Sequence, residues 1–220
     1  MRSPALAYVA PFAAYLALLA IPQWVPIPRL AAHAVRLAVV AGVIAVCSRE
    51  VLALRPSLPW ASIGVGLAVF GIWIGPDLLF GYRHSVLFEN ALTGKAASTL
   101  PETLRHDRVF LSIRLLTTAA LVPILEELFW RGWLMRWLIQ SREFWKVPLG
   151  AYQAGSFWVV ALLFASEHGP YWEVGLLAGI VYNWWIVRTK NLADCILAHA
   201  VTNAALAGYV IAAGQWQYWL

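Results

Sequence analysis

Long apolar stretches alternate with short polar connections along most of the chain. The first three stretches cover residues 5–20, 31–54 and 60–80. An apolar stretch of roughly 20 residues is long enough for a helix to cross the hydrocarbon core of a bilayer. We therefore predict that residues 1–81 form N-terminal transmembrane helices, the third of them interrupted at Gly75-Pro76-Asp77.

A polar loop at residues 82–108 separates this part from residues 109–220, which we expect to pack with it as one bundle. The second part contains four more apolar segments, at 109–139, 151–168, 172–187 and 192–213. The first of these is longer than a ~30 Å hydrocarbon core requires, and it contains Pro123, so we expect a kink or a protruding end. The pattern predicts an all-α, polytopic transmembrane bundle of about seven helices, or eight if the long segment divides.

Composition excludes the soluble classes. Hydrophobic residues make up 61% of the 220 residues, charged residues make up 12%, and the mean hydropathy is +0.69. A soluble domain carries about a quarter charged residues, and disordered chains carry few apolar ones. Thirteen Trp and eight Tyr agree with a membrane protein, because these rings favour the headgroup level.

The net charge of +5 does not indicate nucleic acid as a partner. The basic residues stand singly between apolar segments and form no basic stripe or nucleic-acid motif. We interpret them as loop charges that set the topology and contact membrane lipids. Cys47 and Cys195 each lie inside an apolar segment and form no CxxC pair, so neither a disulfide scaffold nor a thiolate metal site is indicated.

Ionisable residues inside membrane segments are costly and therefore mark candidate functional sites. The first cluster is Glu126-Glu127 followed by Arg131. On a helix Glu127 and Arg131 are four residues apart and can pair, while Glu126 points about 100° away. A free carboxylate in an apolar pocket is suited to act as a general base. The alternative is that all three residues form a structural ion pair that locks two helices.

Two further clusters follow on later segments. Phe164 lies one turn before His168, so its ring can pack on the imidazole. His199 and Asn203 are four residues apart and face the same way, as a donor pair that could hold an oxyanion. Taken singly, each cluster could instead be a structural hydrogen bond between helices. Together they form a set able to activate water and stabilise a tetrahedral intermediate.

A shared site would require His168 to lie at the depth of Glu126 and His199. His168 ends its segment, whereas His199 lies eight residues after Asn191, the expected N-cap of the last segment. Both segments beside the turn at residues 169–171 are short for a ~20-residue span. We therefore predict that this turn does not reach the surface but forms a wall of a cavity inside the bundle.

The ordered patterns EExxxR, FxxxH and HxxxN resemble the CAAX prenyl protease and bacteriocin-processing family of intramembrane endopeptidases. The chain is similar to the members that bacteria encode beside exosortase sorting systems. The resemblance implies a water-filled cavity in which Glu126 activates water and His168 binds and polarises it. His199 and Asn203 would hold the oxyanion, with Glu127, Arg131 and Phe164 as supporting residues.

The resemblance also implies a membrane-associated protein or peptide as substrate and a multi-pass location in a bacterial inner membrane. It suggests components of an exosortase system as partners. No cofactor is expected, because the zinc-protease motif HExxH is absent. If Zn²⁺ were present, Glu126, His168 and His199 would be its ligands. A non-enzymatic scaffold or immunity-type binding protein with the same fold is the competing hypothesis. A transporter is a weaker alternative, because the sequence shows no internal repeat of the kind that many transporters contain.

Overall fold

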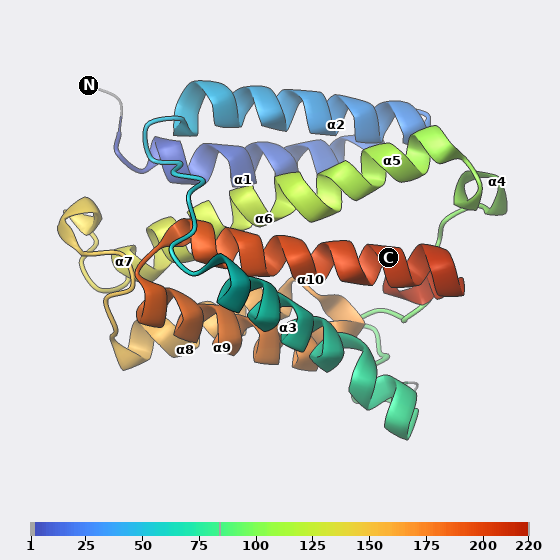
Figure 1. The fold of residues 1–220 in the computed structure, drawn as a ribbon. Coiled ribbons are helices and arrows are strands. Elements are labelled where there is room, and N and C mark those ends of the chain that lie inside the picture. Colours follow the sequence, from blue (N-terminus) through green and yellow to red (C-terminus); the bar gives the residue numbers. More distant parts are fainter. Residues whose placement is uncertain (1–2, 84, 220) are drawn as a thin grey trace.

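The computed structural model describes residues 3–83 and 85–219, and these residues form helices and no strand. The predicted all-α class is therefore confirmed for this part of the chain. Within the described part of the chain, seven long helices and one short surface helix, α4, make up the bundle (Figure 1). The α-helical segments are α1 (Leu6–Ala20), α2 (Arg29–Val43), α3 (Pro59–Phe80), α4 (Glu102–Arg105), α5 (Arg108–Leu116), α6 (Val122–Glu127), α7 (Met135–Trp137), α8 (Ala154–Ser166), α9 (Trp172–Thr189) and α10 (Leu192–Ala213).

The long predicted segment forms one continuous helix of 30 residues, Arg108–Trp137, and does not divide. Two π-helical turns, η3 (Thr117–Leu121) and η4 (Leu128–Leu134), flank α6 within it. Such turns insert a residue into the helix and are frequent at functional sites. Pro123 is the second residue of α6, within the first turn after η3, where a proline is tolerated because its missing N–H costs little. The glutamate pair therefore lies between two irregular turns.

Four helices among the described residues are long and apolar enough to cross a membrane. They are Arg29–Ser48, Pro59–Phe80, Arg108–Trp137 and Leu192–Ala213, while α1 and α8 are shorter apolar helices. The third predicted helix is not interrupted at Gly75-Pro76-Asp77 but continues to Phe80 and ends at Gly81, whose φ is +59°. The length and apolar composition of these helices identify the chain as an integral membrane protein.

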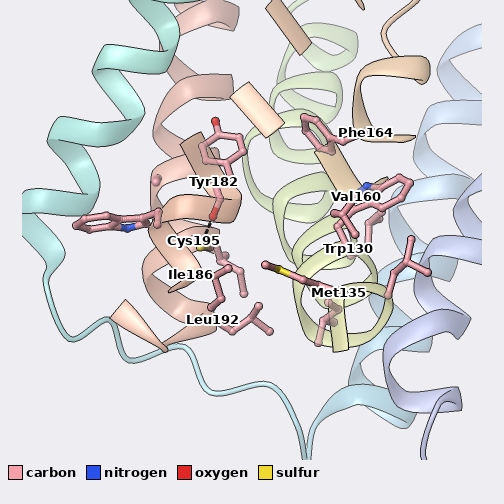
Figure 2. Packing of buried hydrophobic residues seen from close by; sticks show 14 of the residues in the cluster. Trp130, Met135, Val160, Phe164, Tyr182, Ile186, Leu192 and Cys195 are labelled. Carbon is pink, nitrogen blue, oxygen red and sulfur yellow. Dashed lines mark hydrogen bonds between the residues drawn. The ribbon is translucent and has the colours of Figure 1, made fainter. Parts of the chain in front are cut away.

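Helix α10 lies at the centre of the bundle and contacts α3, α6 and α9. Figure 1 shows α1, α2 and α5 along one side of α10, with α8 and α9 on the other. Figure 2 shows the apolar core that joins these layers, in which Trp130, Phe164 and Tyr182 pack with Met135 and Cys195. The central helix is therefore in position to present side chains to both layers.

Helix α3 is fixed to α10 by a carboxylate from α10. Asp194 accepts hydrogen bonds from the backbone N–H groups of Ser57 and Leu58, and from the hydroxyls of Ser57 and Ser62. These bonds satisfy N–H groups at the start of α3 that have no partner within the helix. Gly66 permits the close approach further along, because a Cβ there would collide with the carbonyl of Ala198.

Candidate active site

The four side chains that the motifs single out for chemistry line one cavity of about 270 Å³. Glu126 comes from α6, His168 from the turn after α8, and His199 and Asn203 from α10. Trp73 of α3 forms part of the opposite wall. Helices that are far apart in sequence thus bring a carboxylate, two imidazoles and an amide to one hollow in an otherwise apolar bundle.

Glu127 and Arg131 form a fully buried ion pair behind this cavity. Nη1 of Arg131 lies 3.0 Å from Oε1 of Glu127, and both side chains are 0% exposed. Arg131 also donates from Nε to Oδ1 of Asn183 at 2.9 Å and from Nη2 to the carbonyl of Gly179. The guanidinium lies over the Phe164 ring, 4.7 Å from its centroid. A buried charge with this many partners is held in one orientation.

His199 lies between the two adjacent glutamates. Its Nδ1 is 3.0 Å from Oε1 of Glu127, and its Nε2 is 4.0 Å from Oε2 of Glu126. The ring stacks on Tyr182 with centroids 5.0 Å apart. The phenol of Tyr182 donates to Thr202, whose hydroxyl is 2.8 Å from the carbonyl of Gly66. The imidazole is therefore held by its stacking on Tyr182 and its contact with Glu127, with one nitrogen toward the ion pair and the other toward Glu126.

His168 is held by its own helix end. Its Nδ1 lies 2.7 Å from the carbonyl oxygen of Phe164. Because a carbonyl can only accept, Nδ1 carries the proton, and Nε2 of the neutral ring is left as an acceptor. The rings of Phe164 and Trp73 lie 4.8 and 5.3 Å from the imidazole. Gly175 of α9 leaves space for the ring, since a Cβ there would lie 2.9 Å from Cγ and Nδ1 of His168.

Asn203 is anchored to the irregular part of the long helix. Its Nδ2 donates to the carbonyl of Thr118 at 2.8 Å. Thr118 lies in the π-helical turn η3, which directly precedes α6, the segment that carries Glu126. An amide nitrogen carries two protons, so one remains for a ligand in the cavity.

The turn after α8 is covered by protein, as the segment lengths predict. Helix α8 has 13 residues and so spans only about 20 Å at ~1.5 Å per residue. Pro170 and Tyr171 in the turn are buried. Arg83, from the loop at 82–108, donates to the carbonyl of Pro170 at 3.0 Å and lies over the Tyr171 ring. Arg83 also pairs with Glu173 at 2.8 Å, which fastens the loop to the start of α9.

Several residues of this arrangement escaped the sequence analysis. None of Asn183, Tyr182, Thr202 and Gly175 is one of the defining residues of the three motifs. Asn183 had a usable signal, because an amide in the middle of an apolar helix must find a partner. The sequence places Arg83 in the polar loop at residues 82–108, and only the folded chain places it against the turn.

The described residues do not assemble a recognisable metal centre. No group of three or more His, Cys, Asp or Glu side chains among residues 3–83 and 85–219 has an arrangement that could hold a metal ion. The oxygen of Glu126 and Nε2 of His199 are 4.0 Å apart, wide for neighbouring ligands of one Zn²⁺ at ~2.0–2.2 Å from each.

The fold and the cavity together define a polytopic α-helical membrane protein with a cavity lined by polar and ionisable side chains inside the bundle. Residues 108–205 match the family model described as type II CAAX prenyl endopeptidase, Rce1-like. The matched segment contains both glutamates, both histidines and Asn203. The match supports the CAAX-type intramembrane protease family that the motifs of this segment resemble. No curated protein and no solved structure shows significant similarity to the chain.

Proposed function

We propose that the chain is an intramembrane endopeptidase that hydrolyses a peptide bond of a membrane-associated protein with water activated by Glu126. The observation that carries the proposal is the shared cavity of Glu126, His168, His199 and Asn203. A peptide bond within a membrane can be hydrolysed only where protein encloses a polar space. A bacterial inner membrane is the proposed location, and the association with an exosortase system remains a prediction.

In the proposed reaction, water binds between Glu126 and Nε2 of His168. Glu126 accepts a proton as the water oxygen attacks the carbonyl carbon of the substrate. The resulting oxyanion receives hydrogen bonds from the second amide proton of Asn203 and from Nε2 of His199. The proton on Glu126 then passes to the leaving amine as the C–N bond breaks, which restores the carboxylate.

The proposed role of His199 as an oxyanion donor requires a proton on both nitrogens of its ring, because of the contact with Glu127. An ionised Glu127 can only accept, so Nδ1 of His199 carries the proton of their 3.0 Å hydrogen bond. Nε2 can then donate to an oxyanion only when the ring is doubly protonated. The proposal therefore uses His199 as an imidazolium, with its charge facing two carboxylates. Arg131 holds Glu127 in place for this contact.

A non-enzymatic scaffold is the competing hypothesis. In a scaffold the polar side chains would bond with one another and leave no hollow between them. Glu127, Arg131 and Asn183 do form such a bonded group. Among the described residues the Glu126 side chain, in contrast, makes no hydrogen bond, its contact with His199 is 4.0 Å long, and it lines a cavity. Because Glu127 is bonded and the adjacent Glu126 is left open to the cavity, the arrangement favours an endopeptidase over a scaffold.

The proposal is tested by a cleavage assay on membrane proteins encoded beside this chain. The purified protein and its Glu126→Gln variant are reconstituted separately with each candidate, and the products are identified by mass spectrometry. Cleavage by the first protein alone supports the proposal. If every candidate remains intact with both proteins, or if both cleave equally, the endopeptidase assignment is wrong.

A further inference from the structure

A second cavity adjoins the proposed active site and has a different chemistry. It has a volume of about 400 Å³ and is lined by Arg29, Arg36 and Arg114, with His33 beside them. No carboxylate is present among the described residues that line it. We call it the arginine pocket. Tyr15, Arg114 and Thr118 line both hollows, so the arginine pocket shares a wall with the cavity of Glu126.

The basic side chains gather there because of their spacing on α2. Arg29, His33 and Arg36 are separated by four and three residues, which places them on one face of the helix. Arg114 joins them from α5, which packs beside α2. Arg29 and Arg36 lie outside the segment that matches the protease family. The pocket is therefore built mainly by the N-terminal helices, which carry none of the three motifs.

Arg36 is the deepest of these cations. Its side chain is buried, with 6% of the residue exposed, and its guanidinium lies 5.6 Å from the centroid of the Tyr15 ring. Nε of Arg36 and Nδ1 of His33 are buried without a hydrogen-bond partner among the described residues. Buried charges are normally paired, and a cluster of like charges is costly. The pocket therefore has the charge to bind an anion and, at Nε of Arg36, an open donor to hold it.

Depth indicates where the anion comes from. Arg36 lies seven residues after the first residue of α2, which is roughly 10 Å along the helix axis. The phosphate of a bulk lipid remains at the headgroup level, whereas a substrate in the adjoining cavity is already inside the bundle. Guanidinium groups match the planar geometry of a carboxylate.

We propose that the arginine pocket binds a carboxylate of the peptide substrate, close to the bond that is cleaved. This inference rests on the proposed function and narrows the substrate to an acidic peptide. The carboxylate is an Asp or Glu side chain or a free C-terminus, and both sources have the same chemistry. Since the pocket shares Tyr15, Arg114 and Thr118 with the active site, binding there would also set which bond meets Glu126.

The test measures binding rather than cleavage, so it does not depend on hydrolysis. The full chain with Glu126→Gln is placed in phosphatidylcholine nanodiscs and titrated with three dye-labelled, leucine-rich peptides. One peptide has a single Asp and an amidated C-terminus, the second has Asn and a free C-terminus, and the third has Asn and an amide. We expect the first or second to bind at least about tenfold more tightly than the uncharged third.

Variants locate the effect. Arg36→Gln should remove the preference for the charged peptide, Arg36→Lys should keep part of it, and Arg29→Gln should weaken it at the exposed rim. Arg188→Gln removes the same charge from an exposed position at the end of α9 and should leave the preference unchanged. Thermal unfolding in the same nanodiscs shows whether each variant remains folded. If Arg36→Gln does not fold, the charge preference of Arg29→Gln is the test of the pocket.

Three outcomes overturn the proposal. Equal binding of the three peptides, or no binding of any, means that the pocket selects no carboxylate. A preference that persists in both Arg36→Gln and Arg29→Gln places the recognition elsewhere. Phosphatidylglycerol that co-purifies with the protein and is lost in Arg36→Gln, without any peptide preference, assigns the pocket to a lipid phosphate. Failure of the cleavage assay with intact charge preference would contradict only the proposed function.

Discussion

Nδ1 of His199 lies 3.0 Å from Oε1 of Glu127, although the two residues are 72 positions apart in the chain. This contact joins α10 to the long helix of the glutamate pair. It also gives the two adjacent glutamates different roles, because Glu127 is bound by His199 and Arg131 while Glu126 faces the cavity.

Glu126→Gln should abolish cleavage while the protein remains folded. The amide keeps the size of the side chain and removes the proton acceptor, so the rate should fall at least ~10²-fold, the scale of general base catalysis. A neutral amide costs less to bury than a carboxylate, so thermal stability in detergent should not fall. Glu143→Gln, on the loop after α7, is the matched control. Near-normal cleavage by Glu126→Gln would exclude Glu126 as the base.

Glu127→Ala should destabilise the fold as well as abolish activity. The substitution leaves Arg131 buried without its carboxylate partner, which costs about 3–5 kcal/mol when a buried pair is broken on one side. The measurement is the unfolding midpoint in detergent, compared with that of Glu102→Ala. Glu102 pairs with Arg105 on the exposed helix α4, so its loss should have little effect. A Glu127→Ala protein as stable as the parent would contradict the proposed weight of the ion pair.

Gly175→Ala should reduce activity through His168. The added Cβ would lie 2.9 Å from the imidazole, whose position is fixed by the hydrogen bond to the carbonyl of Phe164. The ring must move, and a displaced catalytic group can lower the rate about 10²-fold. Gly208→Ala in α10 is the control, because no atom lies within 4 Å of its added Cβ. Equal cleavage by the two variants would mean that the placement of His168 does not limit the reaction.

Arg83→Gln should loosen the turn that carries His168. Arg83 donates to the carbonyl of Pro170 and pairs with Glu173, so its loss frees the loop from the turn. We expect faster amide hydrogen exchange in residues 168–173 than in the parent protein, measured by mass spectrometry. Arg105→Gln changes the same loop without touching the turn and serves as the control. Unchanged exchange at 168–173 would show that other contacts hold the turn.

Prolonged chelation should leave activity intact. The proposed reaction assigns water activation to Glu126 and His168, and no step depends on a metal. The measurement combines cleavage after treatment with a strong chelator and metal analysis of the purified protein. Stoichiometric zinc, together with activity that returns only when zinc is added, would instead support Glu126, His168 and His199 as its ligands.

The sequence predicts the helices well because apolar length and helix signals are local properties. The last helix was expected at residues 192–213 and has those bounds, with Asn191 accepting the N–H of Ala193 as its cap. The second helix ends at Ser48 rather than near Leu54, because the apolar run continues into a turn that hydropathy alone does not distinguish from helix. The interruption expected at Pro76 is absent, and a proline within a long apolar helix is tolerated here.

The sequence by itself determined the all-α class, the pairing of Glu127 with Arg131 and the candidate side chains, because each depends on spacing along one helix. Only the tertiary structure decided that His199 contacts Glu127, that Gly175 makes room for His168, and that Arg36 lines a pocket beside Glu126. These relationships join helices far apart in the chain. They depend on the angle and depth at which packed helices meet, which spacing along one helix does not specify.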